Sequence, residues 1–216
     1  MARKTALPTA IKPSSKTTPP KLAAERIRQT ARRMFYKDGI RAVGVDALVA
    51  EAGVTKPSLY RTFSSKDELA ASYLRDYESE FWAKFNAGED THPGDPRAIL
   101  LMYFEGVAQR SAGEAASSDS GTRYRGCGLT NAVVEYPDST HPAHQVAVAH
   151  KAELRTRMVV LATEMGATDP IMLADGLMLL LEGAFVSCQV FGQGGPARYL
   201  PAVANQLIDA SIVTPA

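Results

Sequence analysis

Cysteine and clustered metal ligands are scarce in this sequence of 216 residues, which contains only two cysteines, Cys127 and Cys188. Two cysteines are too few for the disulfide framework of a small secreted protein, and neither has the spacing of a zinc site. His141, His144 and His150 could supply imidazoles, but His150 lies on a different helical face and no cysteine or carboxylate joins them at a ligand interval. We therefore expect reduced thiols, surface histidines at a helix start, and no metal or other cofactor.

Long apolar runs are also missing, since no stretch approaches the roughly 18 residues of a membrane span. The first twenty residues have four cations and four prolines but no apolar centre, so they do not read as a secretory signal. No segment alternates apolar and polar residues with the period of a β-strand. These absences favour an all-α protein in the cytoplasm with no membrane partner.

Signatures of catalysis are absent as well. The sequence has no Gly-x-Ser-x-Gly, no glycine-rich phosphate loop after a strand, and no spaced pair of carboxylates with a plausible partner. The glycine-rich stretch Gly192–Gly195 follows a helical pattern and precedes Pro196, so it is read as a connection. We do not expect an enzyme.

The charge distribution is uneven although the net charge is only +1. Residues 1–75 contain 15 Lys and Arg against 6 Asp and Glu, whereas residues 76–216 contain 9 against 17. Such asymmetry indicates a basic part that meets a polyanion and an acidic part that does not. Nucleic acid is favoured over a membrane surface, because the basic half lacks amphipathic helices with exposed aromatics.

Apolar residues recur at helical spacing along most of the chain and predict about nine helices. Residues 1–20 are expected to be a disordered basic arm and residues 112–126 a polar loop. The expected helices cover residues 22–38, 45–52, a short stretch capped by Thr55, 65–88, 95–110, 127–135, 142–165, 170–190 and 197–213.

The stretch GVTKPSLYRTFSSKDEL at residues 53–69 has the pattern of a helix-turn-helix. Gly53 supplies the turn, Thr55 caps the following helix, and Pro57 falls in its first turn, where the missing N–H costs nothing. Leu59 and Phe63 are four residues apart and face inward. The remaining side chains are left on the outer face, where a helix inserted into a major groove presents them to DNA.

The exposed side chains of this helix suit two kinds of DNA contact. Lys56, Ser58 and Arg61 offer forked donors and a small hydroxyl to base edges. Thr55, Tyr60 and the start of the next helix at Ser65-Lys66 offer hydroxyls and a cation to phosphates. The full expected set of DNA-contacting residues is Val45, Thr55, Lys56, Pro57, Ser58, Tyr60, Arg61 and Lys66.

Residues 22–74 resemble the DNA-binding domain of TetR-family transcriptional regulators. The match rests on Gly53-Val54-Thr55, Leu59-Tyr60, Phe63, Ser65-Lys66 and Leu69. Thr62 takes a place that is often aromatic or His. Gly44 takes one that is usually Ser or Thr, which predicts a weaker cap on the second helix.

The resemblance implies two functional parts: a helix-turn-helix domain at residues 21–66 and an effector-binding and dimerisation domain at residues 67–216. It also implies that the last two long helices, at about 170–190 and 197–213, form a four-helix bundle with a second subunit. The apolar composition of residues 170–190 independently predicts burial on both faces.

A small-molecule effector is expected in the body. Candidate lining residues are Tyr103, Phe104, Cys127, Asn131, Phe185 and Cys188, although aromatic and thiol side chains at helical spacing are usually core. The segment Arg125–Asn131 resembles the start of the sixth helix in one branch of these regulators.

These expectations combine into a homodimeric, ligand-responsive regulator of bacterial transcription. It would repress by binding a palindromic double-stranded DNA operator, and would be cytoplasmic and nucleoid-associated when bound. The alternatives are a helical small-molecule-binding or enzymatic protein with an incidental basic face, and a sequence-neutral architectural DNA binder.

Overall fold

The computed structural model describes residues 20–112 and 124–212, and within these ranges the chain is helical without strands. Nine α-helices and one short 3₁₀ helix follow one another, which confirms the all-α prediction. The predicted basic arm and most of the predicted polar loop lie outside the described residues. The elements are α1 (Pro20–Asp38), α2 (Val45–Ala52), α3 (Lys56–Thr62), α4 (Lys66–Thr91), α5 (Pro96–Ala112), α6 (Gly128–Glu135), α7 (Pro142–Glu164), α8 (Pro170–Phe191), η1 (Pro196–Tyr199) and α9 (Leu200–Ser211).

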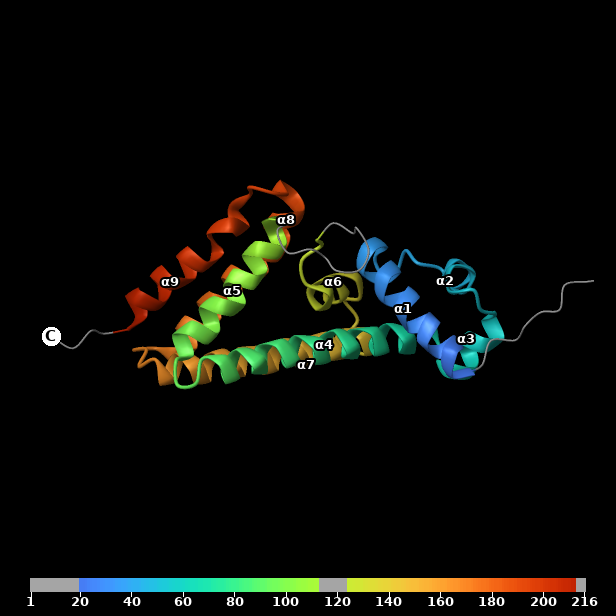
Figure 1. The fold of residues 1–216 in the computed structure, drawn as a ribbon, viewed down its shortest axis with the longest axis horizontal. Helices are drawn as coiled ribbons and strands as arrows, with labels where there is room; N and C mark the ends of the chain where they lie inside the picture. The colour runs from blue at the N-terminus through green and yellow to red at the C-terminus, as the bar shows by residue number, and fades with distance from the viewer. Residues whose placement is uncertain (1–19, 113–123, 213–216) are drawn as a thin grey trace, which may run out of the picture.

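The first three helices form a compact head at one end of the elongated molecule (Figure 1). Ile27 of α1, Leu48 of α2 and Leu59 of α3 are completely buried against one another and against Leu69 at the start of α4. Burying side chains of this size stabilises the domain by about 1.5–3 kcal/mol each. The small apolar core therefore fixes the angle between α2 and α3.

The turn between α2 and α3 depends on Gly53. Its backbone has φ 63° and ψ 38°, the left-handed conformation that a β-carbon disfavours. Its N–H donates to the Ala50 carbonyl at 3.2 Å, and the Val54 N–H donates to the Val49 carbonyl at 3.0 Å. This double closure ends α2 and turns the chain directly into α3, as the sequence predicted.

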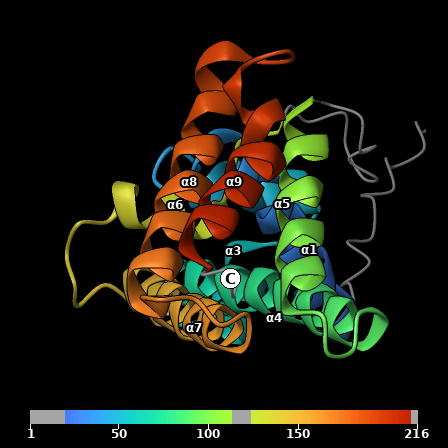
Figure 2. The same ribbon diagram turned by 90° about the vertical axis from the view of Figure 1, so that its left-hand side faces the viewer.

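The body is built around two long helices, α4 and α7, which run side by side (Figure 1). Helices α5, α8 and α9 pack across one end of this pair, and α6 lies between them and the head (Figures 1 and 2). The predicted cap-then-proline starts are present: Asp95 accepts from the Ala98 N–H and Asp169 from the Met172 N–H, both at 2.9 Å. Helix α4 begins at the head and continues along the body, so one long helix connects the two parts (Figure 1).

Helix α4 continues to Thr91, past the predicted end near Gly88. Gly88 lies within α4 and is buried, so it does not end the helix. A β-carbon at this position would lie 2.1 Å from Cε of Met102 on α5. The glycine permits close helix packing. The close approach of two helices at a glycine leaves no local signal in the sequence.

The expectation that no segment approaches a membrane span is wrong for α8. This helix has 22 residues, its apolar window has a mean hydropathy of 1.8, and 39% of that window is buried within the chain. Asp175 and Glu182 interrupt the apolar runs of α8, but the mean hydropathy of the window stays as high as that of a membrane-spanning helix. A helix buried between two layers of protein has the same composition, and α8 packs on α5, α7 and α9.

Candidate nucleic-acid interface

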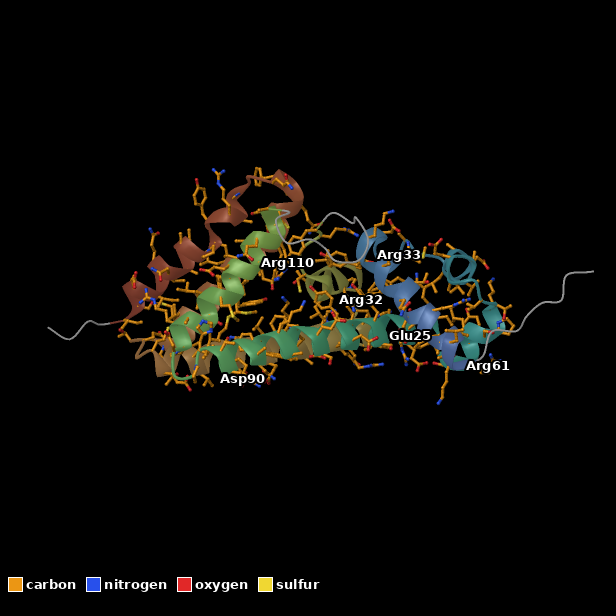
Figure 3. The ribbon with its side chains drawn as sticks, in the orientation of Figure 1. Glu25, Arg32, Arg33, Arg61, Asp90 and Arg110 are labelled. Atoms are coloured by element: carbon orange, nitrogen blue, oxygen red, sulfur yellow. The ribbon has the colours of Figure 1, made fainter. Side chains whose placement is uncertain are left out.

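Helix α3 presents a polar face away from the head core. Leu59 is fully buried and Phe63 is 3% exposed, whereas Lys56, Pro57 and Arg61 are exposed. Figure 3 shows Arg61 at the extreme end of the molecule, pointing away from the body. The predicted division of this helix into an inward and an outward face is confirmed.

The start of α3 is held by its own hydroxyl groups. Thr55 Oγ1 accepts from the Ser58 N–H at 3.3 Å and lies 3.1 Å from Ser58 Oγ. A guanidinium nitrogen of Arg61 reaches Ser58 Oγ at 3.5 Å. Thr55, Ser58 and Arg61 therefore form one connected polar surface on the outer side of the helix.

Lys56 has an intramolecular partner that sequence reasoning missed. Its Nζ lies 2.7 Å from Asp46 Oδ1 of α2, and this hydrogen bond and charge raise the pKa of Lys56 above its usual value. Both groups are well exposed, so the pair is accessible to a competing anion. An acid in the first turn of a helix carries no signal that it will pair with a lysine ten residues later.

Lys66 also differs from a free surface cation. Its Nζ donates to the Arg41 carbonyl at 3.3 Å, and partial burial lowers its pKa. The predicted cap of α4 by Ser65 is confirmed, because Ser65 Oγ accepts from the Glu68 N–H at 3.0 Å. The reciprocal half of the predicted capping box is wrong: Glu68 accepts from the backbone and hydroxyl of Ser64, one residue earlier.

The other predicted contact residues differ in exposure. Tyr60 is 49% exposed, so its hydroxyl is available on the same surface as α3. Val45 is partly buried against the head core at the start of α2. Gly44 caps α2 without a side-chain hydrogen bond, as expected from its lack of a hydroxyl.

The predicted effector residues are distributed through the body. Phe104 is completely buried, and Tyr103 packs edge-on against it with ring centroids 6.0 Å apart. Burial raises the pKa of Tyr103 well above its usual value. Cys127 and Cys188 are buried, and neither forms a disulfide within the described residues.

Two charged residues join these candidates although the sequence did not single them out. Lys151 Nζ lies 3.7 Å from Cys127 Sγ, 5.1 Å from the centroid of the Phe185 ring and 2.6 Å from a Glu182 carboxylate oxygen. Thr130 donates to the other Glu182 oxygen at 2.9 Å. The Lys151–Glu182 ion pair, which is partly buried, therefore lies beside Cys127 and Phe185. The only signal in the sequence was an acid, Glu182, on the otherwise apolar helix α8.

His150 is a correction to the predicted surface histidines. It is 1% exposed, its ring lies 4.7 Å from that of Phe81 and 5.3 Å from that of Trp82, and burial lowers its pKa to about 4. The prediction is wrong because His150 lies three residues after buried Ala147 and four before buried Leu154, on the inward face of α7. His141 lies at the start of α7 as expected, and its Nδ1 caps the helix by accepting from the Ala143 N–H at 3.2 Å.

A groove of about 400 Å³ lies between α1 and α4. Two residues of its lining, Glu25 and Arg32, are labelled in Figure 3. An ion pair between Arg32 and Glu80 links its two walls. Acidic side chains outnumber the arginines along it, so its lining has no excess of positive charge. Its lining comprises Glu25, Arg28, Gln29, Arg32, Leu69, Tyr73, Asp76, Tyr77, Ser79 and Glu80.

A helix-turn-helix head with an outward polar helix, carried on an all-helical body, defines a DNA-binding transcriptional regulator. Residues 27–73 match the family described as bacterial regulatory proteins, tetR family. A TetR-type regulator from Streptomyces avermitilis is 30% identical over 88% of this chain and 97% of its own, with a TM-score of 0.67. The chain belongs to the TetR family of transcriptional regulators.

Two further relatives are similar to parts or most of the chain. A TetR-family regulator from Streptomyces coelicolor is 28% identical over 89% of each chain, with a TM-score of 0.75. The HTH-type transcriptional repressor KstR2 of Mycolicibacterium smegmatis is 27% identical over 111 residues. That match covers 49% of this chain, and the chain spans only 54% of the length of this curated relative.

Proposed function

We propose that the chain is a homodimeric repressor that binds a palindromic DNA operator and is released by a small-molecule effector. The observation that carries the proposal is the outward face of α3, where polar and cationic side chains stand opposite buried Leu59 and Phe63. The name of the similar KstR2 protein supports repression rather than activation.

In the proposed complex α3 enters the major groove while α2 crosses the backbone and holds it at depth. Lys56, Ser58 and Arg61 read base edges, and Thr55 and Tyr60 contact phosphates. Val45, Pro57 and Lys66 complete the contact surface. Lys56 leaves Asp46 when it meets the nucleic acid.

The proposed dimer forms through α8 and α9. Large apolar side chains on these helices are exposed in the single chain, as if a partner covers them. They are Ile171, Met172, Leu179, Val186, Val190 and Phe191 on α8, and Val203 on α9. Two copies packed on this surface form a four-helix bundle that sets the separation of the two heads.

The proposed effector binds in the body, among Tyr103, Phe104, Cys127, Asn131, Phe185 and Cys188. An effector that prefers a dimer with mis-spaced heads weakens operator binding by its differential affinity for the two states. In this scheme residues 21–66 bind DNA, and residues 67–216 bind the effector and the partner. The regulator acts in the bacterial cytoplasm, associated with the nucleoid when bound to DNA, and catalyses no reaction.

A selection from random duplexes tests the proposal. We expect recovery of a palindrome whose half-sites lie about one helical turn apart. If the chain is instead a helical protein with an incidental basic face, it should not retard bulk DNA in a gel at low salt. An architectural binder predicts retardation with no preferred sequence, and either result contradicts the proposal.

A further inference from the structure

The segment that precedes and includes α6 forms a second connection between body and head, besides the continuous helix α4. We call residues 124–136 the strap. Its helix α6 lies between α5 and α1 (Figure 1). Arg125 near the start of the strap bonds to the end of α1, and Glu135 near its end bonds to Arg41 in the turn between α1 and α2. Its polar contacts are concentrated at these two places.

The first attachment joins Arg125 to the C-terminal end of α1. One guanidinium nitrogen donates to the Tyr36 carbonyl at 3.1 Å and to the Lys37 carbonyl at 2.7 Å. These carbonyls belong to the last turn of the helix, whose dipole attracts a cation. Hydrogen bonds from a guanidinium are stronger than those between neutral groups.

The Tyr36 side chain completes this attachment from the head. Its hydroxyl accepts from the Arg125 N–H at 2.9 Å and donates to the Gly126 carbonyl at 3.1 Å. Backbone and side chain of Arg125 are therefore both bonded to one residue of α1. A pair of reciprocal contacts of this kind fixes orientation as well as distance.

The opposite side of the same residues lies against α8. Gly126 has φ 70°, and a β-carbon there would lie 2.6 Å from the Phe185 carbonyl oxygen. Asn131 holds the strap in place, since its Nδ2 donates to the Arg125 carbonyl at 2.9 Å. Gly126 and Phe185 are therefore close neighbours, and a movement of α8 towards the strap at this point presses on Gly126 and the adjacent Arg125.

The second attachment is at the other end of the strap. Glu135 Oε2 accepts from the Arg41 N–H at 2.8 Å, and the Glu135 carbonyl accepts from the Arg41 guanidinium at 3.2 Å. Arg41 lies in the turn that leads to α2. The two attachments together hold α1 from its end and from the following turn.

We propose that Arg125 is a positioning residue that couples α8, the helix of the proposed dimer interface, to α1 and so sets the angle of the DNA-reading head. The inference rests on the proposed function, because only a dimer with two heads has a spacing to set. The path from α8 through Gly126 and Arg125 to α1 bypasses α4. Through this path the body contacts the head directly at the C-terminal end of α1.

The test measures discrimination between half-site spacings, which a loss of stability alone does not change. The probes are the duplex that the wild-type protein selects and the same duplex with one or two base pairs inserted between its half-sites. We expect the wild-type protein to prefer its own spacing by about tenfold or more, as for a defect in a specific site. Arg125→Ala is expected to bind both duplexes with affinities within about threefold of each other, because unheld heads adapt to either spacing.

Three further variants sharpen the comparison. Tyr36→Phe removes the reciprocal contacts and is expected to change discrimination in the same direction, non-additively with Arg125→Ala. Arg125→Lys keeps the charge without the planar fork and is expected to be intermediate. Arg157→Ala is the matched control, since this arginine joins α7 to Glu89 of α4 within the body. It is expected to retain the wild-type preference.

The outcomes separate the two proposals. If the wild-type protein shows no preferred duplex, the proposed function fails and the inference fails with it. If the wild-type protein discriminates but Arg125→Ala and Tyr36→Phe discriminate equally well, the inference alone is overturned. Equal loss in Arg157→Ala also overturns it, because general loosening of the body then accounts for the effect. If Arg125→Ala does not fold, Tyr36→Phe decides alone.

Discussion

Lys56 Nζ of α3 lies 2.7 Å from Asp46 Oδ1 of α2, so the first cation of α3 is paired within the head. The pair links the two helices of the helix-turn-helix at their exposed edges. A phosphate or base edge competes directly with Asp46 for this ammonium group. In the proposed complex, DNA binding exchanges one partner of Lys56 for another.

Removing this competitor is expected to strengthen DNA binding on all sequences. Asp46→Asn frees Lys56, and we expect about a two- to fivefold gain in affinity at low salt, since exposed pairs are weak. Fluorescence anisotropy with cognate and scrambled duplexes measures the gain. Asp90→Asn is the matched control, because it removes the same charge from the end of α4 farthest from α3 (Figure 3). Equal gains in both variants would show that net charge, not release of Lys56, is responsible.

The cap of α3 is expected to stabilise the head measurably. Thr55→Ala removes the acceptor for the Ser58 N–H and should lower the free energy of unfolding by about 1 kcal/mol. Thr55→Ser retains the oxygen and should stay close to wild type. Urea denaturation at fixed protein concentration measures both variants. Equal stability of the two would contradict a capping role.

The exposed apolar face of α8 is expected to be the dimer interface. Leu179 is 75% exposed in the single chain, and Leu179→Arg places a charge in the centre of the proposed interface. We expect a folded monomer by sedimentation velocity, with operator affinity greatly reduced. Val134 of α6 is 77% exposed, so Val134→Arg is the control and should remain dimeric. A dimeric Leu179→Arg protein would place the interface elsewhere.

Buried His150 is expected to make the body sensitive to acid. Its pKa is lowered to about 4 by burial and by Lys151, although Glu78 lies 3.5 Å from its Nδ1 and would act in the opposite direction. The effect of burial on the pKa exceeds that of Glu78, because Nδ1 makes no hydrogen bond within the described part of the chain that would stabilise the charged ring. The unfolded chain, with an ordinary histidine pKa of about 6.5, binds this proton first. Stability from neutral His150 is therefore present above pH 6.5 and is lost as pH falls towards 4.

His150→Phe removes this titration while keeping a ring against Phe81. Between pH 6.5 and 4 the wild-type protein should lose up to about 1.4 kcal/mol per pH unit more than the variant. Denaturant unfolding at a series of pH values, at one protein concentration, measures the difference. Parallel pH profiles for the two proteins would mean that His150 is not held neutral by the fold.

Local signals in the sequence were sufficient for most of the fold. Gly53 and Thr55 act within their own turns, so the bounds of α2 and the start of α3 were predictable. Contacts between distant segments were not, because Asp46 with Lys56 and Arg125 with α1 depend on the tertiary arrangement. Gly88 illustrates the same limit, since a glycine that ends a helix and one that admits a neighbouring helix look alike in sequence.

The candidate DNA-binding surface follows the same division. The outward face of α3 was predicted from the period of Leu59 and Phe63, which requires only helical geometry. The partial burial of Lys66 was not predicted, because it depends on the Arg41 carbonyl across the head. The body candidates were the least predictable, since apolar side chains of core and of a binding site share one spacing.

The most direct test of the central claim is the sequence preference of α3 variants. Operator and scrambled duplexes are titrated with the wild-type protein, Lys56→Ala, Arg61→Ala and Lys66→Ala over a range of salt concentrations. We predict that Lys56→Ala and Arg61→Ala each lose about 1–3 kcal/mol of discrimination, whereas Lys66→Ala weakens binding to both duplexes and flattens the salt dependence. Unchanged affinity of all three variants for the operator would contradict the account of α3 as the DNA-reading helix.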